Sequence, residues 1–97
     1  MVYIENTPDS GLRKVSFIFV AEPGQRVFLA GSFNDWEQEK LPMLYDEKNH
    51  AYTAAVMLGC GNYEYKFVVN GEWITDPGNQ NFSANDFGTL NSVITIG

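Results

Sequence analysis

Cysteine, histidine and basic side chains are scarce in this 97-residue sequence. The one cysteine, Cys60, rules out an internal disulfide and a zinc site made of cysteines. The one histidine, His50, rules out a metal site with several histidines, so we expect no metal. Six lysines and arginines, with one adjacent pair at Arg13-Lys14, face 12 aspartates and glutamates. A nucleic-acid partner is therefore not expected, because nothing in the chain could follow a phosphate backbone.

Long hydrophobic runs are also missing. The longest span about six residues, whereas a membrane-spanning helix needs about 20. Residues 1–10 are polar and lack the apolar segment of a signal peptide. We therefore expect a cytoplasmic protein with no membrane partner. Its length suits one domain, which we divide into a lead-in or loose first strand over residues 1–10 and a β-sandwich domain over residues 11–97.

Helical patterning is absent too, since no segment of helical length keeps a period of 3.6 residues. Turns are expected at residues 59–62 and at Asn70-Gly71, each joining its flanking strands as a hairpin. Residues 31–44 and 76–89 are predicted to be long loops. Runs rich in β-branched and aromatic residues predict an all-β sandwich with strands over residues 15–20, 26–30, 52–58, 63–69, 72–74 and 90–96.

Catalysis has weak support in the sequence. A glycosidase needs two facing carboxylates, but the acidic candidates fall in turns or polar loops, where a solvated acid is the simpler interpretation. His50 is expected in an exposed turn, and Cys60, between two glycines, has no base to activate it. A calcium loop between residues 76 and 86 lacks the EF-hand spacing. The carboxylates considered are Asp35, Glu37, Glu39, Asp46, Glu47, Asp76 and Asp86.

Aromatic residues, by contrast, are abundant at 14% of the chain. Alternation along residues 63–69 directs the aromatic positions to the core and Lys66 to the outward face. Trp36 lies in a polar loop, and Trp73 is one tight turn away from Lys66. Indole rings can stack on sugar rings, while lysine and asparagine hydrogen-bond to hydroxyls. The pattern favours a sugar-binding surface, although both tryptophans could equally be partly buried packing residues.

Three segments resemble the motifs of carbohydrate-binding module family 48: residues 27–36 (VFLAGSFNDW), 62–77 (NYEYKFVVNGEWITDP) and 87–92 (FGTLNS). The family includes glycogen-binding domains of kinase β subunits and N-terminal domains of branching and isoamylase-type enzymes. The likeness extends from about residue 15 to residue 96 and is closest to the kinase-type domain. It implies an immunoglobulin-like, early-set sandwich that binds α-1,4-linked glucans such as glycogen, starch fragments or cyclodextrin. It also implies no cofactor and no catalysis.

The resemblance assigns the glucan contacts to individual residues. Trp36 and Trp73 would be the stacking platforms, Lys66 would donate to sugar hydroxyls, and Asn91 would hydrogen-bond the same chain. Two further positions complete the expected carbohydrate site, Thr89 and Phe87, of which Phe87 departs from the leucine of the kinase-type domain. The alternative function is a protein-interaction or structural sandwich that packs on a catalytic partner, either a kinase subunit or a glucan-branching or debranching enzyme.

Overall fold

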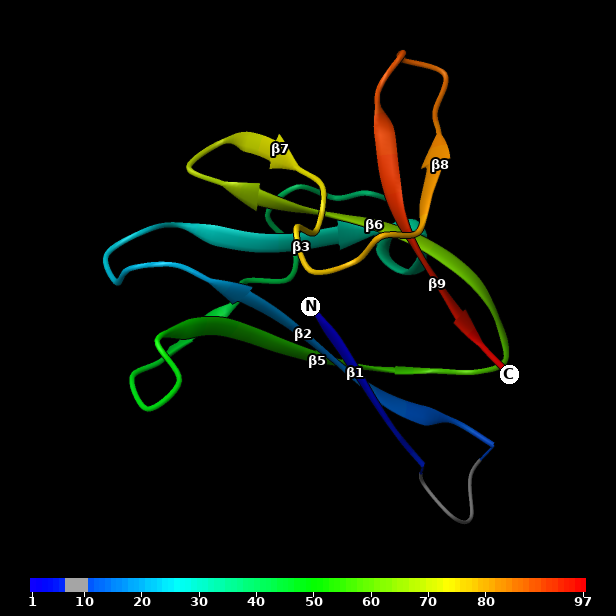
Figure 1. The fold of residues 1–97 in the computed structure, drawn as a ribbon, viewed down its shortest axis with the longest axis horizontal. Coiled ribbons are helices and arrows are strands. Elements are labelled where there is room, and N and C mark those ends of the chain that lie inside the picture. Colours follow the sequence, from blue (N-terminus) through cyan, green and yellow to red (C-terminus); the bar gives the residue numbers. More distant parts are fainter. Residues whose placement is uncertain (7–10) are drawn as a thin grey trace.

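The computed structural model describes residues 1–6 and 11–97, which form two antiparallel sheets packed as a sandwich (Figure 1). The first sheet has the order β1-β2-β5-β4, with the bounds Val2–Asn6, Arg13–Val20, Ala51–Leu58 and Leu44–Asp46. The second sheet has the order β3-β6-β9-β8, with the bounds Val27–Gly31, Gly61–Val69, Leu90–Ile96 and Phe82–Ala84. Strand β7, Glu72–Ile74, pairs with β6. The predicted all-β sandwich is confirmed.

The hydrophobic core lies between the two sheets. Phe17 of β2 and Tyr65 of β6 are both fully buried, and their rings meet edge to face with centroids 4.8 Å apart. Leu29 of β3 and Phe67 of β6 are also fully buried in the same cluster. Because side chains alternate across a strand, these contacts send Lys66 to the opposite face of the second sheet. The expected inward face of β6 is therefore correct.

The two predicted hairpin turns have different outcomes. Asn70-Gly71 joins β6 to β7, with Val69 opposite Glu72, and its two residues have φ angles of 51° and 87°. That prediction is confirmed, because both positions need the left-handed conformation that Asn and Gly tolerate. The hairpin at residues 59–62 is wrong, since β5 and β6 belong to different sheets. Strand β5 pairs with β2 along its whole length, whereas β6 pairs with β3, β7 and β9, so residues 59–60 cross from one sheet to the other.

The long loops contain short elements that the sequence did not predict. Residues 31–44 include the 3₁₀ turn η1, Ser32–Asn34, and the first residue of β4. Residues 76–89 include β8, which pairs with β9. The loop predictions are wrong at these places because a three-residue strand is too short to show a period. It forms only where a neighbouring strand offers a free edge.

The N-terminal segment contributes to the first sheet. Val2–Asn6 forms β1 and pairs with β2, with Val2 opposite Phe17. The lead-in predicted for residues 1–10 therefore contains a paired strand, while its portion over residues 7–10 lies outside the described residues. Within residues 1–6 and 11–97, no helix is long and apolar enough to cross a membrane.

A buried carboxylate anchors the chain where it leaves β7. Asp76 is 0% exposed, although its polar surroundings in the sequence predict a solvated acid. Its side chain accepts hydrogen bonds from the Tyr65 hydroxyl at 2.7 Å, the Gly78 N–H at 2.8 Å and the Met1 ammonium at 2.5 Å. Its own N–H donates to Ser92 Oγ at 2.8 Å. The prediction of a solvated acid is wrong because β6 and β9 bring their polar side chains around this position.

Asn79 completes this group, which we call the Asp76 cluster (Tyr65, Asp76, Asn79 and Ser92). The Asn79 amide donates to the Tyr65 hydroxyl and to the Val93 carbonyl, both at 3.0 Å. Burial and the bond to the Asp76 carboxylate raise the pKa of Tyr65, so this tyrosine stays protonated well above its ordinary range. The cluster joins the start of the 76–89 segment to two strands of the second sheet.

Candidate carbohydrate-binding site

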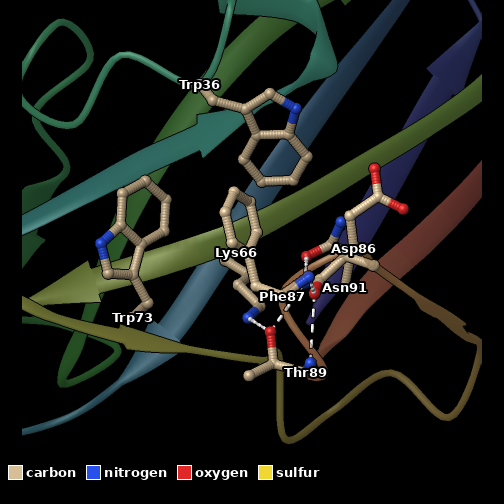
Figure 2. A pocket seen from close by; sticks show the side chains of 8 residues that line it. Trp36, Lys66, Trp73, Asp86, Phe87, Thr89 and Asn91 are labelled. Carbon is tan, nitrogen blue, oxygen red and sulfur yellow. Dashed lines mark hydrogen bonds between the residues drawn. The ribbon is translucent and has the colours of Figure 1, made fainter.

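An open hollow of about 670 Å³ lies at the outer face of the second sheet (Figure 2). All six residues expected at the carbohydrate site line it, together with two residues that the sequence motifs did not assign to the site, Asn85 and Asp86. The eight lining residues are Trp36, Lys66, Trp73, Asn85, Asp86, Phe87, Thr89 and Asn91. The fold thus brings into one place side chains from strands, turns and a hairpin tip that are far apart in the sequence.

Two indole rings form one side of the hollow (Figure 2). Trp73 is opposite Val68 in the β6–β7 pair and is 42% exposed, while Trp36 is half-buried. Their ring centroids are 6.4 Å apart and their planes are inclined by 49°. The two rings therefore present inclined faces, which suits a curved ligand better than a flat one.

The turn before Trp36 explains how this ring reaches the hollow. A Cβ on Gly31 would lie 2.6 Å from the Glu64 carbonyl oxygen, so glycine lets η1 approach β6 closely. The Asn34 side chain accepts from the Gly31 N–H at 3.0 Å and donates to the Leu29 carbonyl at 3.2 Å. Asp35 and Trp36 then follow with φ angles of 56° and 58°, which redirect the chain. A short, well-bonded turn thus orients Trp36.

Lys66 forms the floor of the hollow and is far less exposed than its outward position in the strand suggests. It is 8% exposed, and Val68 on the same face is also buried. The Lys66 ammonium donates to Thr89 Oγ1 at 3.0 Å, so it is directed toward the β8–β9 hairpin. Because an ammonium carries three N–H donors, two remain after this bond. The expectation of an outward-facing lysine is correct for its face, but not for its exposure.

The Asn85 side chain links the polar residues on one side of the hollow by hydrogen bonds. Its side-chain N–H groups donate to Thr89 Oγ1 at 2.7 Å and to Asn91 Oδ1 at 3.0 Å. Asn91 is 8% exposed, and its own amide donates to Glu64 Oε1 at 3.1 Å. We call these residues the Asn85 network (Glu64, Lys66, Asn85, Thr89 and Asn91). Sequence reasoning missed Asn85, although asparagine at the first position and glycine at the fourth of residues 85–88 (NDFG) are typical of a β-turn.

Phe87 is at the tip of the β8–β9 hairpin, which reaches away from the rest of the fold in Figure 1. Its side chain is 91% exposed, so it does not anchor the loop by packing inward. Gly88, with a φ of 80°, supplies the left-handed residue that the tip needs. A bulky apolar side chain held this far into solvent is available for contact with a ligand.

Charged groups at the hollow are few and of mixed sign. Lys66 contributes one positive charge, and Asp86 and the half-buried Glu64 contribute negative charges. Among the residues that the structure describes, no group of three or more His, Cys, Asp or Glu side chains could hold a metal ion. The hollow therefore offers aromatic faces and hydrogen-bonding groups without a strong field of one sign.

A β-sandwich with paired indole rings beside amide, hydroxyl and ammonium groups has the features of a carbohydrate-binding module. Comparison with known proteins agrees: a family described as the glycogen recognition site of AMP-activated protein kinase matches residues 14–97. The chain belongs to this family. The resemblance inferred from the sequence motifs is thus confirmed.

Individual relatives are β subunits of the same kinase. Subunit β-2 from Homo sapiens is 34% identical over 76 residues, which are 78% of this chain and 26% of the relative. Subunit β-1 from Rattus norvegicus is 37% identical over 73 residues, which are 75% of this chain and 25% of the relative. The chain therefore matches about a quarter of the length of these relatives.

Proposed function

We propose that this chain is a non-catalytic module that binds α-1,4-linked glucans in the hollow on the second sheet. The observation that carries the proposal is the meeting of Trp36, Lys66, Trp73 and Asn91 around one open surface. The family supports glycogen as the natural polymer. Starch fragments and cyclodextrins share its linkage and serve as soluble probes.

The proposed mechanism combines stacking with directed hydrogen bonds. The inclined faces of Trp36 and Trp73 would stack on neighbouring glucose rings, and the bend between them suits the curvature of an α-1,4-linked chain. Lys66 would donate its remaining N–H groups to sugar hydroxyls, while Asn91 would use its unfilled donor and acceptor positions. Because the surface is open and the ligand is flexible and hydrated, we expect micromolar to millimolar affinity, about −4 to −8 kcal/mol.

A titration tests this function. Maltoheptaose or β-cyclodextrin should change the tryptophan emission and release heat with a Kd in that range, while cellohexaose, with β-1,4 linkages, should bind far more weakly. Absence of both signals at millimolar maltoheptaose would overturn the proposal. Incubation with glycogen should release no reducing ends, and their release would contradict a non-catalytic role.

A protein partner is a second candidate, and the outer face of the first sheet favours it. Because the core-facing residues of β1, β2, β4 and β5 alternate with outward ones, this face carries exposed apolar side chains at Tyr3, Val20, Leu44 and Met57. The relatives are named as subunits of a kinase. We propose that this face packs on a kinase chain, and co-purification with that chain, lost on Leu44→Lys, is the test.

A further inference from the structure

The Asn85 side chain has no hydrogen-bonding capacity left for a ligand. An asparagine amide offers two N–H donors and an oxygen with two lone pairs. Both donors are occupied by Thr89 Oγ1 and Asn91 Oδ1. The oxygen accepts from the N–H groups of Phe87 at 3.0 Å and Thr89 at 3.1 Å. Asn85 therefore lines the hollow, but every one of its polar positions is directed to the protein.

Those four bonds end on residues that the proposed function uses. One fixes the backbone of Phe87, two fix the backbone and hydroxyl of Thr89, and one fixes the amide of Asn91. The main chain adds two more bonds at the same turn, from Asn85 N–H to the Thr89 carbonyl at 2.9 Å and from Gly88 N–H to the Asn85 carbonyl at 3.2 Å. Asn85 thus supplies most of the bonds at the hairpin tip, and Lys66 adds one to Thr89 Oγ1.

We propose that Asn85 is a positioning residue, which prepares the hairpin tip for glucan binding without contacting the glucan. This inference rests on the proposed function. Phe87 and Thr89 are exposed, so little else orders them in the free protein. If the tip were ordered only when the ligand arrives, the cost of ordering would be subtracted from the binding free energy.

The bonds to the Thr89 hydroxyl determine whether it can donate a hydrogen bond to a sugar or accept one from it. Its hydroxyl oxygen has two lone pairs, and these accept from Lys66 at 3.0 Å and from Asn85 at 2.7 Å. The hydroxyl hydrogen therefore remains as its one open position. Thr89 becomes a donor to a sugar oxygen, while Lys66 keeps its two other N–H groups for the same ligand.

Two substitutions at Asn85 separate the parts of this role. Asn85→Ala removes all four bonds, and we expect affinity for maltoheptaose to fall about tenfold by calorimetry. Asn85→Asp keeps both acceptors for the backbone but loses both donors, so its affinity should fall between those of the parent and Asn85→Ala. Amide exchange of Phe87 and Thr89, followed by NMR, should be faster than in the parent for Asn85→Ala but unchanged for Asn85→Asp.

The matched control is Asn49→Ala, in an exposed turn of the first sheet where the Asn49 amide donates to Asp46 Oδ2 at 2.7 Å. It should leave affinity and the exchange of both tip amides unchanged, and its melting temperature should resemble that of Asn85→Ala.

Affinity of Asn85→Ala within about twofold of the parent would overturn the positioning role. If Asn85→Ala does not fold, the affinity of Asn85→Asp decides the question: a loss beyond about twofold supports the positioning role, and a smaller change overturns it. If the parent itself binds no glucan, the proposed function fails, whereas unchanged tip-amide exchange in Asn85→Ala would reject the positioning role independently.

Discussion

Two polar groups lie at opposite ends of the segment between β7 and β9, and they use similar chemistry for different purposes. In the Asp76 cluster, Asp76 and Ser92 are fully buried, and the acid bonds to groups from β6, the following turn and the N-terminus. The Asn85 network instead borders an open hollow, with Thr89 exposed. Each group centres on one side chain, Asp76 or Asn85, that accepts hydrogen bonds from backbone N–H groups.

Burial decides what each group contributes. Inside the protein, a polar atom that loses its partner costs the free energy of desolvation, so the Asp76 cluster should matter chiefly for stability. Asn85 is half-buried and Thr89 is exposed, so water can replace a partner lost there, and Asn85 should matter less for stability. The Asn85 network leaves unfilled donors and acceptors on Lys66, Thr89 and Asn91 facing the hollow. We therefore expect substitutions in the Asp76 cluster to lower stability chiefly, and substitutions in the Asn85 network to lower binding chiefly.

The largest expected effect is on the buried side of this comparison. Asp76→Ala removes the acceptor of the Tyr65 hydroxyl and the Gly78 N–H, and should lower the free energy of unfolding by about 1–3 kcal/mol for each donor left unpaired. Chemical denaturation measures this loss. Asp86→Ala, an exposed acid of the same segment, is the control and should change stability by less than about 0.5 kcal/mol. Equal losses in the two variants would show that burial does not separate the groups.

The next prediction concerns the hollow. Trp73→Ala should abolish detectable glucan binding by removing one stacking platform, while the melting temperature stays close to that of the parent because the ring is 42% exposed. Calorimetry and thermal denaturation together test this. Phe82→Ala, an exposed aromatic of β8 outside the lining, should bind as the parent does. A collapsed melting temperature for Trp73→Ala would make this ring a packing residue.

A smaller change in affinity is expected at the hairpin tip. Phe87→Ala should weaken binding by about 1–3 kcal/mol if the ring stacks on a sugar, whereas Phe87→Leu should keep most of the affinity. Both variants should melt like the parent, since the side chain is 91% exposed. Calorimetry on the two variants is the measurement. Unchanged affinity in Phe87→Ala would restrict the site to the remaining contacts.

The smallest effect is a pH dependence of the buried group. The pKa of Tyr65 is raised by burial and by its bond to Asp76, so the folded state keeps this proton above the ordinary tyrosine range. Above about pH 10 the unfolded chain loses the proton while the folded chain retains it, and stability should fall as pH rises. Chemical denaturation at several pH values between about 8 and 11, at ~25 °C, measures how steeply the free energy of unfolding falls with pH. Tyr65→Phe should show a shallower slope, and an equal slope would assign it to other groups.

Local chemistry was enough to predict some of this molecule. Strand positions followed from β-branched and aromatic runs, and the β6–β7 turn followed from Asn70-Gly71, whose conformational tolerance belongs to those residues alone. The motifs also indicated the family, and the residues they assigned all line one hollow. Whether each of them touches glucan stays a prediction.

Tertiary structure alone decided the rest, because pairing and burial depend on what else is nearby. Gly59 and Cys60 have turn chemistry, but β5 pairs with β2 while β6 pairs with β3 and β9, so the chain crosses to the other sheet. Asp76 is an acid in a polar segment, and only the packing of β6 and β9 around it makes it buried. Asn85 looks like an ordinary loop residue until the fold brings together the three residues that share its four hydrogen bonds. A sequence determines which conformations and bonds each residue can adopt, whereas the folded neighbours determine which of them are used.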